Sequence, residues 1–213
     1  GENGAGKSTL MKILSGVYPF GTYEGTILYD DQELRLGEGS IQEAIKKGIA
    51  IVYQELTLVP NMNVGENVYL GKEPTENGSI NWNKLYSDTR DILQRYNLDV
   101  DPQTPVKDLG VGKQQMVEIA KALSENAKIL ILDEPTSALS EAEIASLMDI
   151  LRSLKSHGVT CIYITHKLDE FFRITDTVTV LRDGKTVVTK PTRELNQQQL
   201  VSYMVGREMK ERF

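Results

Sequence analysis

Residues 1–9 read Gly1-Glu2-Asn3-Gly4-Ala5-Gly6-Lys7-Ser8-Thr9. This stretch matches the pattern G-x-x-x-x-G-K-[ST], in which glycines let backbone N–H groups turn inward around phosphate oxygens. Lys7 is then expected to reach the β- and γ-phosphates of a nucleotide, and the hydroxyl of Ser8 to bind Mg²⁺. A glycine-rich turn with an exposed lysine is the alternative, and the pattern by itself leaves it open.

The position of this loop in the chain is informative. A phosphate-binding loop joins a buried strand to a helix, yet nothing precedes Gly1. We therefore expect a fragment that lacks strands on the amino-terminal side of the loop. On the other side, residues 10–14 (Leu-Met-Lys-Ile-Leu) predict a helix whose positive N-terminal end adds to the anion site.

Three short apolar runs predict the core of a sheet. They lie at residues 49–53 (Ile-Ala-Ile-Val-Tyr), 129–132 (Ile-Leu-Ile-Leu) and 161–164 (Cys-Ile-Tyr-Ile). Continuous apolar runs of this length are typical of parallel strands that are buried on both faces. Because the runs alternate with stretches of helical periodicity, the sequence predicts an α/β fold with a mostly parallel central sheet.

Two other segments predict a peripheral antiparallel part. Residues 25–29 form one candidate strand, and residues 178–181 continue through an Asp-Gly turn at 183–184 into residues 186–188. An Asp-Gly pair between such runs is typical of a hairpin. The tail from residue 192 to 213 predicts a helix with a charged end.

Between residues 55 and 126 the sequence becomes polar and helical, and Pro60, Pro74, Pro102 and Pro105 interrupt it. This polar, helical pattern with interrupting prolines indicates a helical insertion between two core strands. We expect one domain, with residues 1–54 and 127–213 forming the α/β core and residues 55–126 a helical subdomain.

A second chemical motif ends the apolar run at 129–132. Asp133 and Glu134 follow it directly, at the carboxyl end of a strand, where open α/β sheets bind their ligands. Asp133 is expected to hold Mg²⁺, and Glu134 to polarise an attacking water molecule. A solvated turn is the alternative when such a pair is considered alone.

Two further residues follow predicted core strands. Gln54 comes after the run at 49–53, where it can contact Mg²⁺ or water near a γ-phosphate, or simply cap the strand. His166 follows the run at 161–164 and can hydrogen-bond a γ-phosphate, although a single histidine is more commonly structural.

Composition argues against several classes of protein. The chain has 24 Lys+Arg and 30 Asp+Glu, a net charge of −6, and no cluster of basic residues, so nucleic acid is not an expected partner. Cys161 is the single cysteine and lies in an apolar run, which favours a buried structural role in a reducing compartment. We see neither an 18-residue apolar span nor an export signal, so membrane association is expected to depend on a partner.

In this order the motifs resemble the ATP-binding cassette ATPases of importers, over essentially the whole chain. The resemblance implies a P-loop NTPase fold, ATP and Mg²⁺ as ligands, and Lys7, Gln54, Glu134 and His166 as catalytic residues. Ser8, Gln54 and Asp133 would bind the metal. It also implies that the helical insertion docks on a permease and carries a signature region at Leu109, Gly110, Val111, Gly112, Lys113 and Gln114.

Two residues depart from the family pattern. Gly110 replaces the signature serine that donates to a γ-phosphate, which weakens what this chain contributes to a partner's site. Ser140 stands where the family commonly has aspartate, which puts communication through that loop across a dimer in question.

Looser signatures of this kind are similar to the first half of tandem-cassette monosaccharide importers. Similar stretches lie at residues 18–25, 117–123 and 204–208. The resemblance implies that ATP hydrolysis drives import of a monosaccharide, with a pentose such as xylose favoured. Its partners would be permease subunits, a second ATPase cassette and a periplasmic or extracellular sugar-binding protein. The location would be peripheral, on the cytoplasmic face of the cell membrane.

Three other interpretations are considered. A phosphate-loop kinase for small molecules would need an acceptor site and a lid, and the pattern of Gln54, signature region and His166 argues against it. A cassette protein of translation or DNA repair would show basic patches or a long coiled-coil insertion, and the sequence has neither. A regulatory module that binds nucleotide without turnover is the third.

Overall fold

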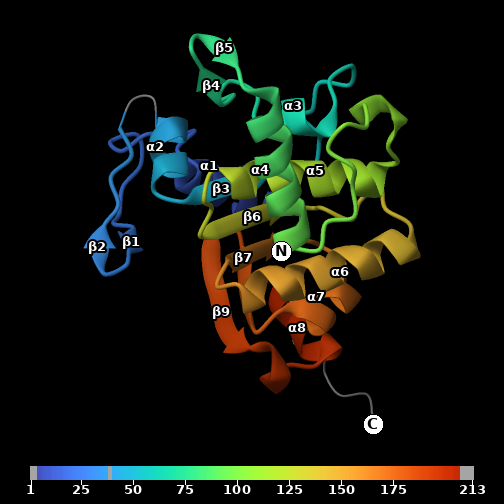
Figure 1. Cartoon of the computed structure of the whole chain (residues 1–213). Coiled ribbons are helices and arrows are strands. Elements are labelled where there is room, and N and C mark those ends of the chain that lie inside the picture. The colour runs from blue at the N-terminus through green and yellow to red at the C-terminus, as the bar shows by residue number, and fades with distance from the viewer. Residues whose placement is uncertain (1–3, 38–39, 207–213) are drawn as a thin grey trace.

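The structure is a computed structural model that describes residues 4–37 and 40–206. At its centre lie three parallel strands, hydrogen-bonded in the order β3-β6-β7. They are β3 (Ile49–Val52), β6 (Ile129–Asp133) and β7 (Thr160–Ile164). All three predicted core strands and their parallel arrangement are thereby confirmed, and Figure 1 shows them in the middle of the molecule.

The prediction that all three strands are buried on both faces is wrong for β7. β3 and β6 are largely buried, whereas in β7 only Ile164 is buried and Thr160 is exposed. β3 and β7 are both edge strands of the sheet that the described residues form, so edge position does not explain the difference. The physical reason is helix coverage, because β3 packs against two helices, α2 (Ser40–Lys46) and α5 (Val111–Ser124), whereas β7 packs mainly against one, α6 (Glu141–Ser156).

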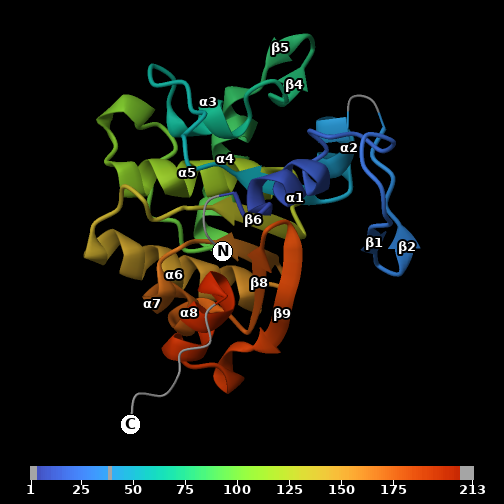
Figure 2. The same cartoon turned by 180° about the vertical axis from the view of Figure 1, so that it is seen from behind.

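Helices cover both faces of the sheet. Leu130 and Leu132 of β6 pack into one hydrophobic cluster together with α5 (Val111–Ser124) and α6 (Glu141–Ser156). Ile131, which points the opposite way, packs with Met11 of α1 (Lys7–Leu14) and Ala44 of α2 (Ser40–Lys46). Figure 1 views the molecule from the side of α4 and α6, and Figure 2 from the side of α1. The result is a three-layered α/β structure.

The segment between β3 and α5 combines helices, a hairpin and long irregular stretches. It contains α3 (Val64–Val68), α4 (Trp82–Arg95), the short 3₁₀ helix η1 (Val106–Asp108), and a hairpin of β4 (Thr75–Glu76) and β5 (Ser79–Ile80). This hairpin was not among the predicted elements. Its signal is Asn77-Gly78, where both residues have positive φ, 52° and 81°.

The remaining strands are antiparallel, as predicted. β1 (Leu28–Tyr29) pairs with β2 (Gln32–Glu33) and is shorter than the predicted strand at 25–29. β8 (Thr177–Arg182) pairs with β9 (Lys185–Pro191) around Asp183-Gly184, whose φ angles are 51° and 73°.

The tail is helical over a shorter stretch than residues 192–213. After α7 (Leu168–Ile174), β8 and β9, the chain forms the short 3₁₀ helix η2 (Thr192–Glu194) and then α8 (Gln197–Val205). Buried residues of β8 pack against α8, whose Leu200 is buried. Residues 207–213 of the predicted helix lie outside the described residues.

Candidate nucleotide site

The described part of the phosphate loop has the backbone that its glycines predict. Gly4 and Gly6 have φ angles of 83° and 97°, in the left-handed region that favours glycine. Ala5 between them is buried, and its carbonyl accepts a hydrogen bond of 3.2 Å from the Gly184 N–H at the β8–β9 turn. The hairpin therefore packs directly on the loop. Gly1, Glu2 and Asn3, which were also predicted to bind phosphate, lie outside the described residues.

Helix α1 begins where the loop ends. Gly6 is its N-cap and provides no side-chain cap, and Ser8 and Thr9 are exposed in the first turn. The first N–H groups of an α-helix have no acceptor within the helix, and the helix dipole makes this end positive. Such an end suits a phosphate group.

The acidic strand end lies beside the loop. Asp133 is the last residue of β6 and is half-buried. Burial raises the pKa of its carboxyl group, Glu134 raises the pKa further, and the ammonium of Lys7 lowers it. Lys7 is thus close enough to Asp133 to act on it electrostatically. The two strongest sequence motifs meet at one edge of the sheet.

Glu134 has an unusual backbone. Its φ is 47°, and its N–H donates to the carbonyl of Ile164 at 2.9 Å. A left-handed conformation costs a residue other than glycine about 1–2 kcal/mol. Strain of this kind is concentrated at functional sites, where the surrounding structure maintains it.

The same backbone places the Glu134 side chain against His166. The Nδ1 atom of His166 is 2.9 and 3.0 Å from the two carboxylate oxygens of Glu134. Since a carboxylate only accepts, the imidazole donates its Nδ1–H. The predicted base and the predicted histidine therefore form one hydrogen-bonded pair.

Gln54 reaches the same edge by strand register. Val52 of β3 pairs with Leu132 of β6, and Leu132 pairs with Tyr163 of β7. Gln54 follows Val52 by two residues, as Glu134 follows Leu132, and it is exposed. Its contact with a metal or a phosphate stays a prediction.

The residues at this edge fit Mg²⁺ only together with a phosphate. Among the described residues no group of three or more His, Cys, Asp or Glu side chains could hold a metal ion. The Ser8 hydroxyl, the Asp133 carboxylate and the Gln54 amide oxygen are hard oxygen donors, the type that Mg²⁺ prefers. Because Mg²⁺ is usually bound by one or two protein groups plus substrate phosphates, this donor set fits.

The signature region lies at the start of α5. Gly110 is the N-cap of this helix, has extended backbone and is exposed, and it offers no side-chain cap. Gln114 donates through Nε2 to the carbonyl of Leu109 at 2.9 Å, and Lys113 is paired with Asp99 at 3.8 Å. Val111 is exposed and Gly112 is buried.

Three acidic residues outside the predicted site support these elements. Glu170, which is buried, accepts hydrogen bonds of 2.6 Å from both Thr136 Oγ1 and Tyr163 Oη, behind the segment that follows Glu134. Glu118 accepts from the Thr57 N–H and hydroxyl, three residues after Gln54. Glu143 contacts the signature helix.

Only Glu143 had a sequence signal among these three. Ser140 and Glu143 have the spacing of a capping box, and the structure forms it. Glu118 and Glu170 act through contacts between segments that are distant in sequence, which spacing does not reveal.

Cys161 is a free, partly buried thiol. Burial raises its pKa to about 11, so the thiolate is scarce at neutral pH. Its partial burial in β7 agrees with the predicted structural role.

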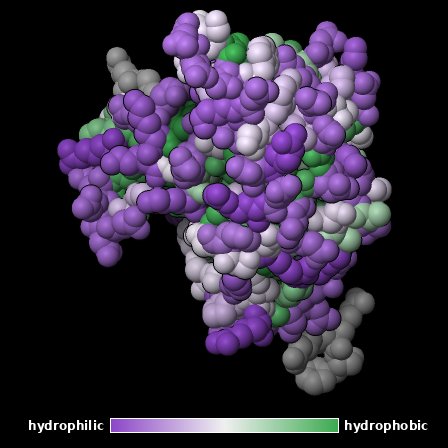
Figure 3. All heavy atoms as spheres, in the orientation of Figure 1, coloured by the Kyte–Doolittle hydropathy of each residue, from purple (hydrophilic) through white to green (hydrophobic). Residues whose placement is uncertain are grey.

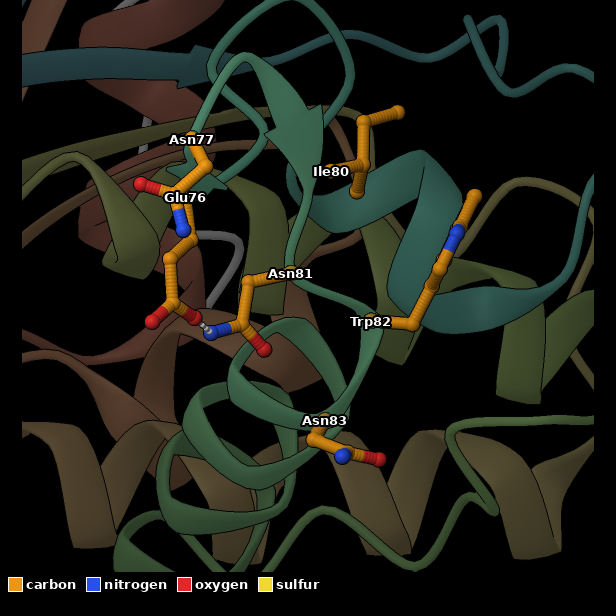
Figure 4. Close-up of a pocket in the computed structure, with 6 residues that line it drawn as sticks. All are labelled: Glu76, Asn77, Ile80, Asn81, Trp82 and Asn83. Carbon is orange, nitrogen blue, oxygen red and sulfur yellow. Dashed lines mark hydrogen bonds between the residues drawn. The ribbon is translucent and has the colours of Figure 1, made fainter.

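Two surface pockets lie away from the nucleotide edge. One of about 480 Å³ is formed by the β4–β5 hairpin and the start of α4, where Asn81 donates to Glu76 while Ile80 and Trp82 point to the other side (Figure 4). The other, of about 400 Å³, is lined by α4, the end of α5 and His157. The face in Figure 3 is mainly hydrophilic, with hydrophobic residues in small separate spots.

Comparison with known proteins decides the family. The sequence pattern of the family described as ABC transporter matches residues 1–137. The chain belongs to the ABC transporter family. Membership of this family agrees with the predicted and observed α/β fold. It also agrees with the position of the phosphate loop beside the acidic strand end in the structure.

Individual members of the ABC transporter family match the entire chain. It is 58% identical over 213 residues to the xylose import ATP-binding protein XylG of Thermoanaerobacter pseudethanolicus, and 55% identical over 211 residues to that of Geobacillus kaustophilus. These alignments cover 100% and 99% of this chain, and 42% of each relative. The chain thus spans less than half the length of these curated relatives.

Solved ABC transporter structures have the same fold. The structure of cbiO1 from Clostridium perfringens, part of the ABC transporter complex cbiONQ, matches with a TM-score of 0.78 and 27% identity, covering 97% of this chain and 80% of that one. Within residues 4–37 and 40–206 of the present cassette, every helix is too short or too polar to cross a bilayer.

Proposed function

We propose that this cassette binds ATP with Mg²⁺ and hydrolyses it to drive import of a monosaccharide, with xylose favoured, through a membrane permease. The observation that carries the proposal is the meeting of Lys7, Asp133, Glu134 and His166 at one edge of the sheet. The sugar rests on the xylose import proteins to which the chain is similar.

Each residue has a specific role in the proposed reaction. Residues 1–9 and the N-terminus of α1 bind the phosphates, and Lys7 stabilises the charge on the γ-phosphate. Glu134 accepts a proton from the attacking water, and Gln54 and His166 orient the water and the γ-phosphate. Ser8, Gln54 and Asp133 would hold Mg²⁺, which neutralises phosphate charge when bound.

In the proposed assembly the other parts of the chain contact partner proteins. Residues 55–126 would act as a helical subdomain that docks on the permease, and its signature at residues 109–114 would complete the nucleotide site of a second cassette. With a sugar-binding protein outside the membrane, this cassette would work at the cytoplasmic face. The net charge of −6 supports a role without nucleic acid.

Reconstitution tests the proposal. The full-length protein that contains this chain, placed with its permease in vesicles, should take up labelled xylose only when ATP is present, and Glu134→Gln should abolish uptake. Hydrolysis that does not respond to any monosaccharide would contradict the import function. Nucleotide binding without turnover would instead favour a regulatory module.

A further inference from the structure

Helix α5 begins without a cap of its own. Its N-cap residue, Gly110, has no side chain to accept from the first turn. The N–H of Gly112 in that turn donates instead to Oε1 of Glu143 at 3.1 Å. This acceptor comes from α6, 31 residues further along the chain.

The same carboxylate also caps α6. Its Oε2 atom accepts from the N–H and from the hydroxyl of Ser140, both at 2.8 Å, while the Glu143 N–H donates to Ser140 Oγ at 3.4 Å. One side chain therefore holds the first turns of two helices. A negative charge is favourable at both N-termini, and these hydrogen bonds lower the pKa of Glu143.

Glycine at position 112 leaves room for the Glu143 carboxylate. A Cβ atom added there would lie 2.6 Å from Oε1 and 2.8 Å from Cγ of Glu143. Contacts under 3.0 Å require the carboxylate to move. A side chain at position 112 would therefore displace the Glu143 carboxylate from its present position beside the Gly112 N–H.

We propose that Glu143 is a positioning residue that couples the signature turn at residues 109–114 to the loop at residues 135–140, which follows the base Glu134. The inference rests on the proposed function, because the signature matters only if it faces a nucleotide. It links the two departures from the family pattern: Gly110 leaves the turn uncapped, and Ser140 binds the carboxylate that caps it.

Amide hydrogen exchange tests the coupling without any activity. In the full-length protein, Glu143→Ala should accelerate exchange at the Gly112 N–H at least about tenfold, the effect of losing one hydrogen bond to a charged group. Ser140→Ala should accelerate it about threefold, because the carboxylate loses the Ser140 hydroxyl but keeps the backbone N–H of residue 140 as a donor. Gln199→Ala is the matched control, since Gln199 completes the capping box of α8 and contacts a single helix.

Steady-state ATP hydrolysis by the full-length protein with its permease tests whether this coupling affects the nucleotide site. Glu143→Ala should raise the KM for ATP on the order of tenfold with a smaller change in kcat, because a misplaced signature weakens closure around nucleotide. Gly112→Ala should do the same, and the double variant should add little to either. Gln199→Ala should leave the KM unchanged.

The outcomes distinguish a failure of the proposed coupling from a failure of the proposed function. Unchanged Gly112 exchange in Glu143→Ala, or equal KM values in Glu143→Ala and Gln199→Ala, would overturn the coupling. If Glu143→Ala does not fold, Glu143→Gln keeps the length and one acceptor, and should shift exchange and KM in the same direction by smaller factors. A wild type that hydrolyses no ATP would refute the proposed function, and the exchange results of Glu143→Ala and Ser140→Ala would then decide the coupling alone.

Discussion

The Nδ1 atom of His166 lies within hydrogen-bond distance of both carboxylate oxygens of Glu134, at 2.9 and 3.0 Å. The carboxylate is thereby oriented by its histidine, which donates its Nδ1–H. Orientation of a general base by a fixed partner is what proton abstraction requires.

Glu134→Gln should reduce ATP hydrolysis by about 10²- to 10⁴-fold, because the amide cannot accept a proton from water. Nucleotide affinity should change little, since the phosphate-binding residues are intact. Steady-state hydrolysis and nucleotide binding measured on the same preparation check this, and unchanged turnover would remove Glu134 from the role of base.

The tautomer of His166 can be observed by nitrogen NMR. Nδ1 should carry the proton in the wild type, and in Glu134→Gln the Nε2–H form should gain population because the acceptor has lost its charge. His157, whose Nδ1 is 2.7 Å from the carbonyl of Ser153, serves as the reference and should not respond. An unchanged His166 spectrum would show that the pair does not form.

Lys7→Met should weaken ATP binding by at least about tenfold, because the phosphates lose a direct counter-charge worth 1.4 kcal/mol or more. Lys12→Met is the matched control, in the same helix but exposed and placed over the ring of Tyr18. Titration with a fluorescent ATP analogue measures both. Equal affinities in the two variants would contradict the role of Lys7.

Asp133 should make the free energy of unfolding depend on pH. Because its folded-state pKa is raised, the folded chain keeps a proton that the unfolded chain has already released. The free energy of unfolding contributed by this group therefore falls as pH rises from the ordinary pKa of 3.8 through the folded-state value, and it stays lower above that value.

Asp133→Asn removes this effect. At pH 7 without nucleotide its unfolding midpoint should exceed that of the wild type, and the difference should vanish near pH 3, where the wild-type carboxyl is protonated. With ATP present, Mg²⁺ affinity should fall about 10- to 100-fold. Thermal unfolding over a pH series and a Mg²⁺ titration check the two effects, and a variant less stable at pH 7 would count against this account.

Glu170→Ala should destabilise the fold by about 2–4 kcal/mol, because the hydroxyls of Thr136 and Tyr163 would be left without their acceptor. Tyr163→Phe, which removes one of the two bonds, should cost about 1 kcal/mol. Glu141→Ala, at an exposed position, should change stability by less than about 0.5 kcal/mol. Urea unfolding measures all three, and a small effect of Glu170→Ala would contradict the network.

The central sheet and the main site were predictable because both depend on local patterns. The apolar runs at residues 49–53 and 129–132 are continuous, and the phosphate loop and the Asp-Gly turn at 183–184 require glycine at fixed positions. In parallel strands the carboxyl ends meet at one edge, so Gln54, Glu134 and His166 could be placed at that edge from sequence.

Other features depend on contacts that no local pattern encodes. The bond between Glu143 and Gly112 joins two helices, and the pairing of Glu170 with Tyr163 needs a helix to fold back on a strand. The left-handed backbone of Glu134 also has no sequence signal, since this conformation usually marks glycine or asparagine. The exposure of β7 likewise depends on which helices pack against it.

The hydrogen bond from the Gly184 N–H to the Ala5 carbonyl joins the β8–β9 turn to a residue near the start of the described chain. A ligand that rigidifies the segment around Ala5 should also raise the free energy of local opening at the distant hairpin. Ligand bound near Ala5 would therefore be detected as increased resistance to proteolysis at the β8–β9 turn, almost 180 residues further along the chain.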